Sequence, residues 1–226
     1  MDDLNDEFKF TDEEVVVYFS KLKKIIESGI EDCIVGIRIE VKINGKLKSK
    51  EGTGFFCNIP SKHMKVFITT NHILNQEFLD REKKLILSLK NKQQKEINLE
   101  LKRFMQTNEL YDFTVIEIIK QDNFSNFIEL DENINSKDYI NQAIFTFQFP
   151  EGAELSYSHG KIISKKDSFF THNIGAINGS DGAPVVLMDN LKLIGLHKES
   201  LKNGENKEIM NIGIPINLVI NNLNIN

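Results

Sequence analysis

Apolar and polar residues follow two different periods along the chain, one on each side of residue 30. In the stretch VVVYFSKLKKII (15–26) apolar residues recur every three or four positions, which is typical of a one-faced helix. Thr11 and Glu14 form a capping-box pattern at its start, so we expect a helix that ends near Gly29. The apolar face should pack onto the body, although its basic stretch KLKK (21–24) leaves a docking element or a solvated face as alternatives.

From Ile34 onward the period changes to two. Apolar and charged residues alternate in IRIEVKI (37–43), and Asn44-Gly45 then supplies a tight hairpin turn. Further short strands are expected on both sides of a polar connector at 122–139: 46–50, 54–57, 66–70, 85–89, 97–101, 113–119, 143–149, 160–163, 184–188, 191–196 and 210–216. Because no helical run separates these strands, the pattern indicates an antiparallel sandwich or barrel, closed by a short helix within NLVINNL (217–223).

The composition is that of an ordinary globular protein with enough apolar residues for a sizeable core. The 226 residues carry a formal charge of −5, so no basic surplus indicates nucleic-acid binding. No segment approaches the roughly 20 apolar residues of a membrane helix, and the acidic start lacks the apolar run of a secretory signal. Cys33 and Cys57 cannot form a disulfide framework; we expect two reduced, half-buried thiols in a cytoplasmic protein.

Five short motifs carry the candidate chemistry, and their order along the chain matters more than any one of them. They are GTGFF (52–56), ITTNHIL (68–74), YDFTVI (111–116), NGSDGAPV (178–185) and LIGLH (193–197). In this order they resemble the trypsin-like (chymotrypsin-fold) serine proteases, especially the intracellular and bacterial members close to glutamyl endopeptidases. The resemblance extends from about residue 34 to residue 216.

The resemblance implies an all-β protein made of a double antiparallel β-barrel with Greek-key connections, an N-terminal helix and a short C-terminal helix. We expect an acidic segment and helix at 1–30, a first barrel at 31–128, and a second barrel with the closing helix at 129–226. The implied partner is a peptide or protein, with no nucleic acid, no membrane and no cofactor. The oligomeric state is not indicated.

His72 and Asp112 correspond to the general base and to the carboxylate that orients it. An alcohol attacks a carbonyl only when a neighbouring imidazole takes its proton, and a buried carboxylate fixes the imidazole tautomer. His72, Asp112 and residue 181 should therefore meet in the cleft between the barrels. A metal ion held by the three is disfavoured, because the two carboxylates would flank the ring; we expect an ion-paired trio with His72 protonated.

The motif NGSDGAPV (178–185) departs from the family pattern at the nucleophile itself. Three residues before Pro184 the family has Ser, whereas this chain has Asp181. The resemblance assigns the oxyanion hole to Gly179 and Asp181, and there a carboxylate would oppose the developing negative charge. We therefore expect a catalytically inactive pseudoprotease that keeps a peptide-binding groove. The alternative is a serine endopeptidase whose nucleophile was substituted at position 181; Ser180, one residue earlier, should point elsewhere.

The remaining histidines differ in what they suggest. His197 matches the position at which relatives that cut after Glu bind the substrate carboxylate, so an acidic side chain would be preferred if peptide still binds. The alternative is a strand-end histidine that faces solvent beside Lys198. His63, His159 and His172 show no metal-ligand spacing, and we expect them on loops or the surface.

Overall fold

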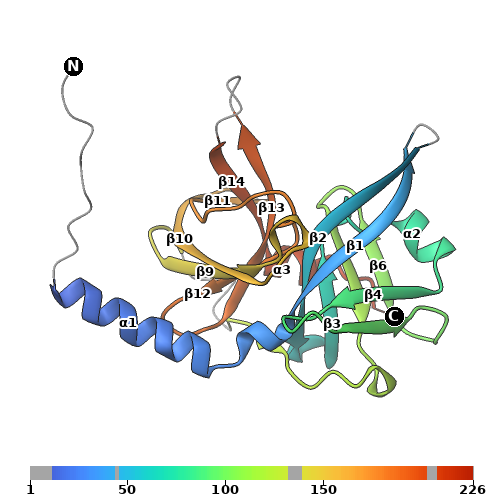
Figure 1. Cartoon of the computed structure of the whole chain (residues 1–226), viewed down its shortest axis with the longest axis horizontal. Helices are drawn as coiled ribbons and strands as arrows, with labels where there is room; N and C mark the ends of the chain where they lie inside the picture. The colour runs from blue at the N-terminus through green and yellow to red at the C-terminus, as the bar shows by residue number, and fades with distance from the viewer. Residues whose placement is uncertain (1–11, 44–45, 132–138, 203–207, 226) are drawn as a thin grey trace.

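The computed structural model describes residues 12–43, 46–131, 139–202 and 208–225, and these form two β-lobes that lie side by side (Figure 1). Predictions that fall on Thr11, on the Asn44-Gly45 turn, or on part of the connector lie outside the described residues. No helix in this part of the chain is both long and apolar enough to span a membrane. The all-β class is confirmed.

The first lobe is an eight-stranded sheet that curls into a half-barrel. Its strand order is β5-β4-β1-β2-β3-β7-β6, with β8 added in parallel beside β2. The strands are β1 (Ile34–Ile43), β2 (Lys46–Ile59), β3 (Met64–Thr69), β4 (Lys84–Ser88), β5 (Gln94–Asn98), β6 (Met105–Asn108), β7 (Phe113–Glu117) and β8 (Ile128–Glu129). The predicted strands at 46–50 and 54–57 are one continuous strand, β2.

The second lobe is a closed six-stranded barrel in the order β10-β11-β14-β13-β12-β9. The strands are β9 (Ala143–Gln148), β10 (Ser156–Lys165), β11 (Phe170–His172), β12 (Pro184–Leu187), β13 (Leu193–Lys202) and β14 (Glu208–Pro215). A half-barrel sheet and a closed barrel side by side make the double β-barrel, chymotrypsin-like fold that the sequence predicts.

Strands β3 and β7 are buried along most of their length, which explains their nearly continuous apolar sequences. On β2, Phe55 and Cys57 belong to the cluster that also contains the barrel residues, whereas Phe56 belongs to a second cluster within the first lobe. Strand β3 alternates in the same way, with Phe67 in the second cluster. The period of two thus divides one strand between the interface of the lobes and the core of the first lobe. Cys33 and Cys57 are free and fully buried, not half-buried.

Three helices complete the fold. They are α1 (Asp12–Glu27), α2 (Gln76–Arg81) and α3 (Ile216–Asn221). Helix α1 runs beside the barrel (Figure 1); Ile25 is buried, and Lys21 Nζ lies 2.6 Å from Asp189 Oδ1. The prediction that Ile26 belongs to a buried apolar face is wrong, because Ile26 is 59% exposed. The side chains of α1 up to residue 19 lie outside the described part of the structure.

Two further expectations need correction. The segment 122–139 is more than a polar connector, because β8 pairs with β2 and Ile128 is buried. The strand expected at 97–101 is β5, three residues earlier, since Leu99 follows the strand and packs into the second cluster from a turn. Strands β6 and β11, helix α2 and the first half of β10 were not predicted.

Candidate active site

His72 stands on a tight turn directly after β3. The amides of Ile73 and Leu74 both donate to the carbonyl of Thr70, at 3.3 and 3.2 Å, and this turn lifts the imidazole out of the sheet. Lys50 Nζ, from β2, donates to the His72 carbonyl at 2.8 Å. The His72 side chain is 40% exposed, so it is open to a ligand that enters from solvent.

Asp112 lies immediately before β7, the strand that pairs with β3. Its φ is +57°, a left-handed conformation that Asp adopts more readily than most residues. The carboxylate accepts from the His72 amide at 2.9 Å through Oδ1, and Oδ2 lies 2.8 Å from His72 Nδ1. Asp112 thus fixes both the backbone and the ring of His72, and it requires a proton on Nδ1.

The loop that carries Asp181 needs glycine on both sides. Gly179 has φ +92° and Gly182 has φ +89°, and a Cβ at Gly182 would lie 2.1 Å from the carbonyl oxygen of Thr53. The Thr53 amide donates to the Asp181 carbonyl at 2.8 Å, so the loop is held against β2 of the other lobe. The structure thereby brings Asp181 Oδ2 to 3.1 Å from His72 Nε2.

The amides of Gly179 and Asp181 are free to receive an anion. The Asn178 carbonyl accepts from Glu151 at 2.6 Å, which turns the Gly179 N–H of the same peptide group the opposite way. Neither the Gly179 nor the Asp181 N–H donates a hydrogen bond within the described chain. Unused backbone amides in such a loop are groups that can donate to an anion.

Ser180 is engaged within its own loop. Its side chain is fully buried, and its hydroxyl accepts from the Ile177 amide at 3.0 Å inside the turn. The hydroxyl is therefore used to shape the loop, as the sequence analysis expects for a turn residue.

His197 is buried, so the alternative of a solvent-facing histidine is wrong. It is 2% exposed, and its Nε2 lies 3.5 Å from Asp181 Oδ1 without forming a hydrogen bond. Its Nδ1 lies 3.2 Å from Nε2 of His172. His172 was expected at the surface but is 1% exposed on β11, because the closed barrel turns this strand inward. His63 and His159 are exposed, as expected.

The proton positions on the histidine pair follow from one backbone contact. The Ile174 amide donates to His172 Nδ1 at 3.3 Å, so the proton of neutral His172 resides on Nε2 and is donated to His197 Nδ1. Because His197 Nδ1 accepts this hydrogen bond, the His197 Nε2 atom, which faces Asp181, carries a proton. Burial lowers the pKa of His172 to about 3, which keeps it neutral.

Opposite charges dominate the electrostatics around His72. Burial alone would lower its pKa, but hydrogen bonds to Asp112 and then Asp181 raise it to about 9. Burial of Asp181 acts to raise its pKa, but contacts with His197 and His72 lower it to about 2. At neutral pH the site is a protonated imidazole between two carboxylates. No cluster of three or more His, Cys, Asp or Glu side chains in the described ranges is arranged to hold a metal ion.

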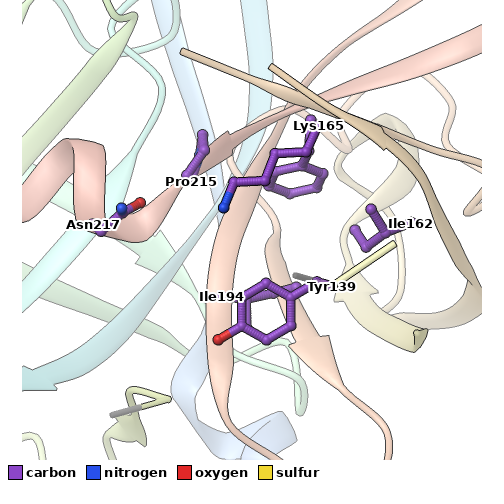
Figure 2. A pocket seen from close by; sticks show the side chains of 7 residues that line it. Tyr139, Ile162, Lys165, Ile194, Pro215 and Asn217 are labelled. Atoms are coloured by element: carbon purple, nitrogen blue, oxygen red, sulfur yellow. The ribbon is translucent and has the colours of Figure 1, made fainter. Parts of the chain in front are cut away.

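His72, Asp112 and Asp181 line an open groove of about 510 Å³. Its other walls are Lys50, Asn71, Asn75, Glu109, Lys198 and Glu199. A second hollow lies in the barrel (Figure 2). Most of its lining side chains are apolar, and Tyr139 and Lys165 also contribute to the lining. It encloses about 20 Å³, room for about one water molecule, and shares no residue with the groove, so the groove is the candidate site.

The fold and the order of these elements define a trypsin-like serine peptidase fold. Among 297 matching chains of known structure is the serine endoprotease from Yersinia pestis, with a TM-score of 0.65 and 16% sequence identity. The match covers 88% of this chain and 64% of that chain, so this chain spans less than two thirds of its neighbour. No protein-family model and no curated protein matches the sequence. At this identity the likeness shows the fold alone.

Three contributors to the site were missed by sequence reasoning. Thr53 was quoted only as part of a motif, yet its hydroxyl accepts from Phe149 at 2.9 Å and donates to the Gly179 carbonyl at 2.8 Å. His172 carried no sequence signal, because its partner His197 is 25 residues away. Lys50 was read only as part of a hairpin strand.

Proposed function

We propose that this chain is a trypsin-like peptidase homologue without endopeptidase activity, which binds a peptide or protein segment in the groove at His72. The observation that carries the proposal is the contact of Asp181 Oδ2 with His72 Nε2 at 3.1 Å, at the place where the resemblance expects a serine hydroxyl. Attack by a carboxylate on an amide would give a mixed anhydride. The negative charge of the Asp181 side chain would also oppose the formation of an oxyanion at the amides of Gly179 and Asp181.

The alternative is a serine endopeptidase whose nucleophile has been replaced at position 181. The intact surroundings favour it: Asp112 still holds His72 through two contacts, and the amides of Gly179 and Asp181 remain unused. In either reading we infer that His197 gives the groove of a serine-containing variant a preference for Glu or Asp before the scissile bond, as in the glutamyl-endopeptidase-like members.

The substitution Asp181→Ser tests both readings. The unsubstituted chain should show no burst of acyl-enzyme and no reaction with a fluorophosphonate, whereas the variant should react if the rest of the machinery is competent. The matched control is the double variant Asp181→Ser/His72→Ala, which should be unreactive. Hydrolysis of Glu-containing peptides by the single variant favours the substituted endopeptidase; silence with retained peptide binding favours the binding protein. Hydrolysis by the unsubstituted chain would contradict the proposal.

A further inference from the structure

The carboxylate of Asp181 lies between two imidazoles that come from different lobes. Oδ2 is 3.1 Å from His72 Nε2, and Oδ1 is 3.5 Å from His197 Nε2. Each oxygen of one carboxylate therefore faces a different ring. The loop of Asp181 is held by the Thr53 amide and by its two glycines, so this position is fixed by the backbone as well as by charge.

The Nε2 atom of His72 and the Nε2 atom of His197 both present a proton to the Asp181 carboxylate. Asp112 binds His72 at Nδ1, and the protonated ring carries a second proton on Nε2. The contact chain from the Ile174 amide through His172 places the His197 proton on Nε2. Two N–H donors, one of them on the protonated His72 ring, make a natural carboxylate-binding pair.

Asp181 fills this position incompletely. His197 Nε2 is buried and makes no hydrogen bond in the described part of the chain, because the short Asp side chain stops 3.5 Å away. A buried, unsatisfied donor costs free energy, and a carboxylate not tied to the backbone could approach both rings at hydrogen-bond distance. The unused N–H groups of Gly179 and Asp181 add two further donors on the same loop.

We propose that His72 and His197 form a two-imidazole site for a small carboxylate, and that the Asp181 side chain is its resident, poorly fitting ligand. In the unsubstituted chain a second carboxylate meets the charge of Asp181 and is excluded. The consequence for peptides rests on the proposed function: as long as Asp181 is present, the groove disfavours ligands that place an acidic side chain here. The anion site itself does not depend on peptide binding.

The other charged groups that face this site do not reverse the expected exclusion of a second carboxylate by Asp181. Lys50 and Lys198 line the same groove and attract an anion, while Glu109, Glu199 and Asp112 oppose it. Because this set is shared by every variant in the test, the variants differ in the charge and volume at position 181 and in the pKa of His72, which the Asp181 carboxylate helps to raise.

The test is a titration of the full chain with formate, followed by NMR of the imidazole rings at neutral pH. We expect Asp181→Ala to bind formate at least tenfold more tightly than the unsubstituted chain, with shifts at both His72 and His197. Asp181→Asn fills the same volume without the charge and should bind weakly. Asp167→Ala, which removes an exposed carboxylate elsewhere in the barrel lobe, should behave as the unsubstituted chain does.

A second substitution separates the site from adventitious binding. Adding His197→Gln to Asp181→Ala should abolish the tight formate site; tight binding that survives this change, or shifts confined to His72, would overturn the proposal. Equal formate affinity with and without Asp181 would also overturn it. If circular dichroism shows that Asp181→Ala does not fold, Asp181→Ser serves in its place. Formate binding in a variant that binds no peptide would contradict the proposed function while leaving the anion site standing.

Discussion

The two carboxylates on either side of His72 are held in very different ways. Asp112 contacts the residue twice, through the amide at 2.9 Å and through Nδ1 at 2.8 Å, and its side chain is 11% exposed. Asp181 makes one contact at 3.1 Å, and its side chain is 30% exposed. The contact between His72 and Asp112 is thus double and largely buried, whereas the opposite side of the ring holds a single, more exposed carboxylate.

The origin of this difference lies in the sheets. His72 and Asp112 follow and precede two strands, β3 and β7, that pair directly, with Thr69 opposite Thr114. Their separation is therefore set within one sheet. Asp181 belongs to the other lobe, and its position depends on contacts between lobes, chiefly those made by Thr53. A change at position 181 can thus alter the group that faces His72 Nε2 without disturbing the contacts between His72 and Asp112.

The largest effect is expected from Gly182→Ala. The new Cβ would lie 2.1 Å from the Thr53 carbonyl oxygen, and φ of +89° is unfavourable for alanine, so the loop must move away from His72. We expect a loss of about 4 kcal/mol in the free energy of unfolding, measured by urea denaturation. The matched control is Gly175→Ala, which is exposed and would meet only Ser158 Oγ at 3.3 Å. Equal losses in both variants would contradict the tight approach of the lobes.

Removing the hydroxyl that joins the lobes should have the next largest effect. Thr53→Val keeps the side-chain shape but leaves the Phe149 amide and the Gly179 carbonyl without this partner. A loss of about 2 kcal/mol is expected in the same urea experiment, since both groups are buried. Thr107→Val is the control, because its exposed hydroxyl contacts only the Gln76 side chain, at 3.1 Å. A Thr53→Val variant as stable as this control would show that the bridge is unimportant.

Residues whose neighbours are close in sequence were predicted better than those whose partners come from afar. Local periodicity indicates both terminal helices and an antiparallel sandwich or barrel, and the resemblance carried by the order of the motifs implies the double barrel. Position 181 could be located because the resemblance places the family's nucleophile three residues before Pro184. The burial of His172 and the Thr53 bridge depend on barrel closure and lobe packing, with partners 25 and 126 residues away, and no local pattern encodes such distances.

His172 and His72 should change the free energy of unfolding in opposite directions as the pH changes. The pKa of His172 is lowered to about 3, so its contribution to stability is complete above pH 6.5 and is lost as the pH falls toward 3. The pKa of His72 is raised to about 9, so its contribution is complete below pH 6.5 and is lost as the pH rises through 9.

The free energy of unfolding, measured by urea denaturation at pH values between 4 and 10, tests the direction of both pH dependences. Relative to the unsubstituted chain, His172→Gln should flatten the acid limb by about 2 kcal/mol between pH 6.5 and 4, because its buried ring no longer takes up a proton on unfolding. His72→Gln should flatten the alkaline limb instead. His63→Gln, at an exposed position, should change neither limb. Flattening of the same limb by both of the first two variants would contradict the assigned protonation states.

The most direct comparison of the two carboxylates comes from Asp112→Asn and Asp181→Asn. Each substitution keeps the side-chain volume and removes one charge, so each should lower the pKa of His72 from about 9 toward 6.5. Asp112→Asn should lower it more, because Asp112 is the closer and less exposed partner. An NMR titration of the His72 ring measures both shifts. A larger effect from Asp181→Asn would mean that the contact between lobes, and not the pair within one sheet, holds the proton on His72.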